Sequence, residues 1–255
     1  MKLRILGCDG GRGMGYENTT LLFNDHILID AGTIQTALTM EEALDITDIF
    51  FTHSHLDHIV DLPFLMDATF GSRPDPLHIY GIRPTIDAFM THLFNNSIWP
   101  DFSKLPTKDS GQFDTTYIKP EVSYTVGDLT FTPIEVNHTI PCVGYKVEDD
   151  DGAIIFSGDT GPTDKLWEIA NETENLKAVI VDLSFPVSEQ YIADISGHMT
   201  AQDVEKELKK LKKDCDVYTF HYKVGMGTLL AGQAKRISHF GKPLKPLRLM
   251  ETLEI

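Results

Sequence analysis

The sequence has few cysteines, and its first residues contain no long apolar run. The three cysteines, Cys8, Cys142 and Cys215, lie far apart and form no Cys-x-x-Cys pair. This spacing argues against a disulfide framework and excludes a zinc site built on thiolates. Because the start, MKLRILGCDGG, has no basic segment followed by a long apolar run, we expect neither a signal peptide nor a membrane span. We assign the protein to the cytoplasm.

Positive charge is also scarce. The chain has 22 lysines and arginines against 38 aspartates and glutamates, which gives a formal net charge of −16. Such a protein repels the phosphate backbone of a long nucleic acid unless it carries a local basic patch. The dense basic run at residues 209–213 lies beside glutamates in a stretch of helical pattern, which favours a solvated helix face. We therefore expect a small substrate, no long nucleic acid and no membrane partner.

The apolar pattern predicts an α/β protein. We expect one domain over residues 1–255, with a loop-rich insert at about 95–120. The first half is mostly strands and the second half alternates strands with helices, which is typical of layered sheets with helices outside. Predicted strands are 3–8, 20–23, 27–29, 46–52, 124–126, 129–136, 144–147, 153–157, 178–182 and 216–220, and predicted helices are 33–44, 62–70, 84–94, 163–172, 201–211 and 228–238.

The strongest functional signal is the segment THSHLDH at residues 52–58, directly after an apolar strand. In an extended segment, residues two apart point to the same side, so His53 and His55 can reach one metal ion. Asp57 and His58 follow as the chain turns into a helix and can face a second ion. Three imidazoles and one carboxylate suit zinc, iron, manganese or cobalt.

Further ligands must come from elsewhere in the chain. His138, Asp159 and His221 each follow the end of an apolar strand, where sheet proteins place functional loops. Together with the first segment they form a coherent ligand set. His198 lies just before a predicted helix, where an imidazole and free backbone N–H groups can bind a phosphate. A glycine-rich loop at residues 10–15 does not have GxGxxG spacing, and we expect it near the site.

These residues resemble the metallo-β-lactamase superfamily, whose HxHxDH motif is complete at residues 53–58. The resemblance implies a four-layer αββα sandwich with the site at one edge of the sheets. It also implies two divalent metal ions, zinc foremost with manganese or iron as alternatives. The implied ligands are His53, His55 and His138 for one ion, Asp57, His58 and His221 for the other, and Asp159 between them.

A narrower resemblance is to the phosphodiesterase branch of that superfamily. The segment GHMTA at residues 197–201 is similar to a motif of ribonuclease Z, in which the histidine meets the substrate phosphate. SGDTGP at 157–162 and IWPDF at 98–102 resemble class II cyclic-nucleotide phosphodiesterases. The chain departs from that pattern at Asp61, where a small residue is more usual, and at Asp182, where glutamate is more usual. The family also suggests a homodimer.

We therefore predict a dinuclear hydrolase that converts a 3′,5′-cyclic nucleotide, cAMP or cGMP, to the 5′-monophosphate. His198 and Asp57 are the predicted catalytic residues. His198 would also bind the substrate phosphate. The rings of Trp99 and Phe102 are candidates for stacking on the base.

Three alternatives share the metal motifs. A tRNA 3′-processing endonuclease would need a basic surface, and usually a Gly/Pro-rich arm, which are not evident here. A thioester, lactone or lactam hydrolase would leave the GHMT segment unexplained. A diiron redox or oxygen-binding protein usually carries a carboxylate where this chain has His55.

Overall fold

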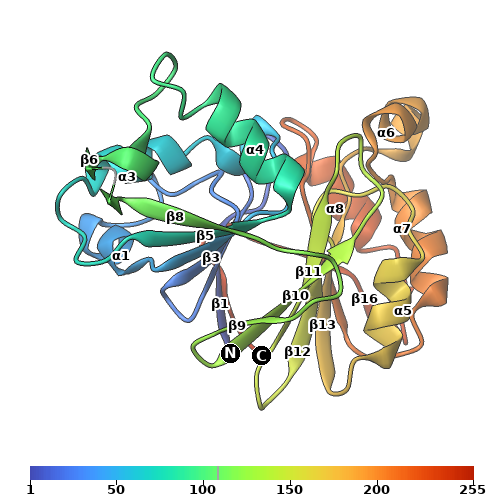
Figure 1. The fold of residues 1–255 in the computed structure, drawn as a ribbon. Helices are drawn as coiled ribbons and strands as arrows, with labels where there is room; N and C mark the ends of the chain where they lie inside the picture. Colours follow the sequence, from blue (N-terminus) through green and yellow to red (C-terminus); the bar gives the residue numbers. More distant parts are fainter. Residues whose placement is uncertain (108) are drawn as a thin grey trace.

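The computed structural model describes residues 1–107 and 109–255, which form two seven-stranded sheets packed face to face with helices on both outer sides (Figure 1). The first sheet has the order β18 (Thr252–Glu254), β1 (Lys2–Gly7), β2 (Thr20–Phe23), β3 (Ile27–Ile29), β4 (Asp48–Phe50), β5 (Leu77–Gly81) and β8 (Phe113–Tyr117). The second has the order β17 (Lys245–Pro246), β14 (Asp216–Phe220), β13 (Leu176–Asp182), β12 (Ala153–Phe156), β11 (Val143–Glu148), β10 (Leu129–Glu135) and β9 (Tyr124–Val126).

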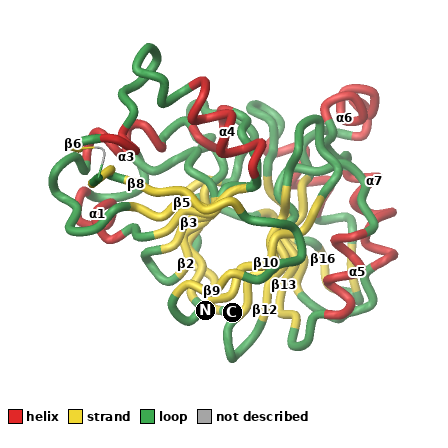
Figure 2. The backbone as a smooth tube through the Cα atoms, in the orientation of Figure 1, coloured by secondary structure: helices red, strands yellow, loops and turns green. Residues whose placement is uncertain are grey.

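Helices cover the outer face of each sheet (Figures 1 and 2). Over the first sheet lie α1 (Met40–Asp45), α2 (Leu56–Ile59), α3 (Leu62–Ala68), α4 (Arg83–His92) and the 3₁₀ helix η1 (Phe102–Lys104). Over the second lie α5 (Lys165–Glu172), η2 (Val187–Glu189), α6 (Gln190–Ser196), α7 (Ala201–Glu207), η3 (Leu208–Lys210) and α8 (Gly227–Ala234). Two small hairpins pair β6 (Pro106–Thr107) with β7 (Ser110–Gly111) and β15 (Ser238–His239) with β16 (Lys242–Pro243).

Three apolar cores hold these layers together. The central core lies between the sheets, where the rings of Phe50 and Phe131 stack with centroids 4.1 Å apart and Tyr145 meets Phe50 edge-on. A second core packs α1, α3 and α4 on the first sheet, and a third packs α5, α7 and α8 on the second. The predicted αββα sandwich is therefore confirmed.

Most predicted elements agree with the structure, and the differences at residues 33–44 and 95–120 have identifiable reasons. The helix predicted over 33–44 begins only at Met40, because Thr39 caps it together with Glu42. Ahead of this cap, the carboxylate of Asp61 accepts from the backbone N–H of Ile34 and Gln35 and holds the chain in a loop.

The segment predicted to be loop-rich, 95–120, contains a strand of the first sheet. β8 runs parallel to β5, with Leu77 opposite Phe113, and the Phe113 ring is buried. The short helix α6 was not expected either. In the part of the chain that the structure describes, no helix is both long enough and apolar enough to cross a bilayer.

Several strands in each sheet are parallel, and this places the loops that carry the predicted site residues close together. β3, β4, β5 and β8 are parallel, and so are β12, β13, β14 and β17. The carboxyl ends of neighbouring parallel strands lie at the same edge of a sheet. The loops after β4, β12 and β14 therefore open at one edge of the sandwich.

Candidate metal centre

The structure brings all seven predicted metal ligands together. The loop after β4 carries His53 and His55, and the adjoining helix α2 carries Asp57 and His58. The other three follow β10, β12 and β14, and they are His138, Asp159 and His221. Potential ligand atoms lie within 4.8 Å of one another in three groups, the third of which also includes His198: His53, His55, His138 and Asp159; Asp57, His58 and His221; Asp159, His198 and His221.

Asp159 lies at the middle of the cluster and is almost completely buried. Its Oδ2 is 3.1 Å from His221 Nε2, 3.3 Å from His58 Nε2 and 3.8 Å from His53 Nε2. On one side, His138 Nε2 and His55 Nδ1 are 3.1 Å apart. On the other, Asp57 Oδ2 is 3.4 Å from His221 Nε2. This arrangement has one shared carboxylate between two groups of ligand atoms.

The chemistry of these atoms fits metal ions. The Nε2 atoms of His53, His58 and His221 and the Oδ1 atom of Asp159 are buried, and none has a hydrogen-bond partner among residues 1–107 and 109–255. A buried polar atom without a partner costs free energy. Four such atoms lie close together here. Bound cations would explain them, because the nitrogen and oxygen lone pairs would then have partners.

Hydrogen bonds at the Nδ1 atoms orient the rings of His53 and His58. Asp30, fully buried after β3, accepts from His58 Nδ1 at 2.7 Å and from Thr52 Oγ1 at 2.8 Å. Thr52 Oγ1 lies in turn 2.9 Å from His53 Nδ1. Such outer contacts fix the tautomer, so that Nε2 of His53 and His58 is left for a metal.

A second carboxylate serves the other half of the site. Asp182, at the end of β13, accepts from His198 Nδ1 at 2.7 Å and from Ser184 Oγ at 2.8 Å. Ser184 Oγ also lies 2.9 Å from His221 Nδ1. The Nε2 atom of His198 makes no hydrogen bond within the described ranges, and the ring stacks on His221 with centroids 4.9 Å apart.

These orienting roles were not predicted for Asp30, Asp182, Thr52 and Ser184. A signal was present, because Asp30 and Asp182 are carboxylates at the ends of apolar strands, as Asp159 is. What the sequence could not give was the pairing of each carboxylate with a particular imidazole.

Glycine is required at the end of α6. Gly197 has φ +66°, and a Cβ there would lie 3.0 Å from the backbone N of Thr139. The carbonyl of Gly197 accepts from His138 Nδ1 at 2.9 Å. The left-handed turn therefore both ends the helix and orients the ring of His138, a predicted metal ligand.

Burial sets the protonation of most of these rings. It lowers the pKa of His53, His55 and His138, and it lowers the pKa of His221 to about 4. A neutral imidazole is the form that binds a metal. Burial alone would raise the pKa of Asp159, but the surrounding imidazoles hold that pKa well below its usual range, so the central carboxylate is ionised.

The glycine-rich loop lies against the site, as expected. A Cβ on Gly10 would come within 2.7 Å of His221 Cε1, so only glycine fits there without a shift. Arg12 reaches across to the other half, where it donates to the Gly32 carbonyl at 2.7 Å and pairs with Asp61 at 3.1 Å. The unusual residue Asp61 thus anchors this loop.

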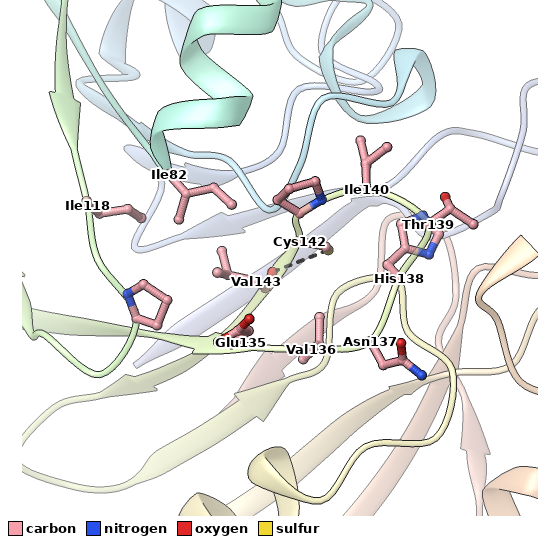
Figure 3. A pocket seen from close by; sticks show the side chains of 12 residues that line it. Ile82, Ile118, Glu135, Val136, Asn137, His138, Thr139, Ile140, Cys142 and Val143 are labelled. Atoms are coloured by element: carbon pink, nitrogen blue, oxygen red, sulfur yellow. Dashed lines mark hydrogen bonds between the residues drawn. The ribbon is translucent and has the colours of Figure 1, made fainter.

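Two cavities meet at His138. One of about 490 Å³ lies between the loop 136–143 and the residues Ile82 and Ile118, and both polar and apolar side chains line it (Figure 3). The other, of about 370 Å³, lies between His138, His198, Gly161 and Asp194. Small-molecule sites usually occupy about 300–1,000 Å³, so both are large enough for a small ligand beside the metal ligands.

The predicted stacking residues have different surroundings. The Phe102 ring is buried in the core beside Phe94, so it is not free to stack on a substrate, and that prediction is wrong. Trp99 is half-buried and meets Phe64 of α3 edge-on, with ring centroids 5.4 Å apart. Its contact with a base stays a prediction.

Known proteins resemble this chain over the segment that carries the cluster. A family model described as a beta-lactamase superfamily domain matches residues 25–222, which include every ligand of the cluster. The chain belongs to this superfamily. The predicted superfamily, its fold and its character as a hydrolase are thereby confirmed.

Individual relatives include enzymes of the phosphodiesterase branch. A probable 3′,5′-cyclic-nucleotide phosphodiesterase of Yersinia pestis is 28% identical over 253 residues, covering 82% of this chain and 71% of the relative. A ribonuclease Z of Pyrococcus horikoshii is 33% identical over 131 residues, covering 49% of this chain and 39% of the relative. The crystal structure of unliganded yeast PDE1 superposes with a TM-score of 0.84 at 18% identity, covering 100% of this chain and 99% of that one. At that identity, the structural likeness supports the fold alone.

Proposed function

We propose that this superfamily member is a metal-dependent phosphodiesterase, and that its substrate is a 3′,5′-cyclic nucleotide. The observation that carries the proposal is the cluster of seven ligand-type side chains beside the His198–Asp182 pair. The cluster supplies a place for two cations, and the pair supplies an imidazole for a phosphate.

The ligands would divide into two sets with a shared carboxylate, namely His53, His55 and His138 for one cation, Asp57, His58 and His221 for the other, and Asp159 for both. When bound, divalent cations supply Lewis-acid chemistry, which neutralises charge on phosphate oxygens and acidifies water. Zinc is the expected metal, and manganese and iron accept the same donors.

The chain's own residues would complete the reaction. Asp57 is the carboxylate of the cluster with the most exposed side chain, at 27%, so it can orient a water molecule for attack on phosphorus. As the water oxygen bonds to phosphorus and passes a proton to the Asp57 carboxylate, the bond from phosphorus to the 3′ oxygen breaks. His198, fixed by Asp182 at Nδ1, would donate the proton from Nε2 to that leaving oxygen.

Size and charge favour a small substrate over tRNA. The cavities at His138, of about 490 and 370 Å³, are of the order that a mononucleotide occupies. The net charge of −16 opposes binding of a long polyanion. Ribonuclease-like cleavage is the second candidate, because a relative named ribonuclease Z is 33% identical to this chain over 131 residues.

The test is hydrolysis of 3′,5′-cAMP by the purified protein, with the metal content measured on the same sample. Turnover with about two metal ions per chain is expected. Two ions without turnover of cAMP or cGMP would refute the cyclic-nucleotide proposal, and the same preparation would then be assayed on precursor tRNA.

His198 provides a more specific test. Replacing it with alanine should lower kcat for the phosphodiester by about 100-fold or more, because general acid catalysis is lost. Metal content should stay the same, since His198 is outside the proposed ligand set. Unchanged kcat in His198→Ala would remove the residue from the mechanism.

A further inference from the structure

A lysine lies beside the metal centre without an acidic partner. Lys223 is half-buried two residues after His221, and its backbone N–H donates to the Ser184 carbonyl at 3.4 Å. Its Nζ is 5.8 Å from the centroid of the Phe185 ring, within the range of a cation–π contact. Among residues 1–107 and 109–255, Nζ forms neither a salt bridge nor a hydrogen bond.

The surroundings of Lys223 link it to the reacting groups. The Phe185 ring beneath Nζ also meets the ring of His198, with centroids 5.9 Å apart. Ser184, which holds the backbone of Lys223, also contacts His221 Nδ1.

Arg12, the positively charged side chain on the opposite side of the site, has acidic partners that Lys223 does not have among the described residues. Arg12 pairs with Asp61 at 3.1 Å and with Glu17 at 3.4 Å, so two carboxylates neutralise it. Lys223 therefore leaves a local positive charge at the site of a protein whose net charge is −16. An ammonium group that has no counter-ion among residues 1–107 and 109–255 favours an anionic ligand, since charge-assisted hydrogen bonds are the stronger ones.

We propose that Lys223 binds a phosphate oxygen of the substrate and makes the site selective for anionic phosphodiesters. This inference rests on the proposed function. Phe185 would limit the positions that the ammonium group can take, through its ring face. Lys223 would then bind the anion while His198 serves the leaving oxygen, so the two residues would have separate roles.

The experiment measures binding of inorganic phosphate to the metal-loaded protein by titration calorimetry. Lys223→Gln should weaken phosphate binding by about 10- to 100-fold, the range expected for loss of a charge-assisted hydrogen bond. Lys223→Arg keeps the charge and should bind more tightly than Lys223→Gln. Lys177→Gln makes the same change of net charge at the other end of β13, and its affinity should equal that of the wild type.

Metal content and thermal unfolding of each variant show whether the site is intact. Equal phosphate affinity in Lys223→Gln and wild type would overturn the inference, as would equal weakening in Lys177→Gln, which would indicate an effect of bulk charge. In activity assays, Lys223→Gln should mainly raise KM for the phosphodiester. If wild type cleaves no phosphodiester while Lys223→Gln still binds phosphate weakly, the proposed function fails and the anion-binding role of Lys223 stands.

Discussion

The replacement Asp30→Asn tests how the fold prepares the metal centre. The Asp30 carboxylate is fully buried and accepts from Thr52 N, Thr52 Oγ1 and His58 Nδ1, at 2.8, 2.8 and 2.7 Å. Asparagine has the same shape but only one acceptor oxygen and an NH₂ group. Oδ2 of Asp30 accepts from both side-chain donors, and Oδ1 accepts from the backbone N–H of Thr52. The NH₂ group of asparagine would therefore face either that backbone N–H or both side-chain donors.

The expected consequence is a wrong tautomer at the metal site. In either orientation of the amide, Nδ1 of His58 loses its charged acceptor, so the proton is held there less firmly. Protonation of Nε2 in its place removes the lone pair that faces Asp159. Changes in such outer contacts typically weaken metal binding by about 10- to 100-fold. That factor corresponds to about 1.4–2.8 kcal/mol.

The assay is competition with a chromophoric chelator for zinc at fixed pH. Glu207→Gln is a matched control, because Glu207 is also a buried carboxylate, accepting from Trp167 Nε1 at 2.8 Å on the outer side of the second sheet. It should lower the free energy of unfolding and leave zinc affinity unchanged. If Asp30→Asn bound zinc as tightly as wild type does, the orienting role of Asp30 would be refuted.

Three further changes have separate readouts. Gly10→Ala places a Cβ 2.7 Å from His221 Cε1 and should weaken zinc binding in calorimetry; unchanged affinity would mean that the loop shifts freely. Burial raises the pKa of Asp9 to about 6. Between pH about 4 and 6 the folded state therefore binds a proton that the unfolded state has lost, and the free energy of unfolding falls as the pH rises through that window. Asp9→Asn should flatten that part of the melting temperature against pH. Thr200→Ala removes the cap that bonds to Asp203 and should lower the free energy of urea unfolding by about 1 kcal/mol.

Local sequence predicted elements well wherever neighbouring residues decide the structure. Strands predicted at 20–23 and 27–29 are observed, joined by a turn with positive φ at Asn24 and Asp25. The helix predicted from residue 201 begins there, because Thr200 caps it. The prediction failed where distant residues compete. Asp61 holds residues 34 and 35 out of a helix, and β5 draws residues 113–117 into a parallel sheet.

The sequence by itself determined the type of ligands and the places where they leave the strands. The HxHxDH spacing and the positions of His138, Asp159 and His221 after apolar strands are local properties of the chain. Parallel strands then bring their ends to one edge, so the cluster follows from the strand pattern and the family resemblance.

Only the tertiary structure decided how that cluster is oriented and what surrounds it. Asp30 contacts His58 across 28 residues, Asp182 contacts His198 across 16, and Lys223 lies over a ring that also meets His198. Hydrogen bonds and charges act over a few ångströms in space, whatever the separation along the chain. The partners of each imidazole, and the lysine without a partner, therefore became visible only when the two sheets were packed together.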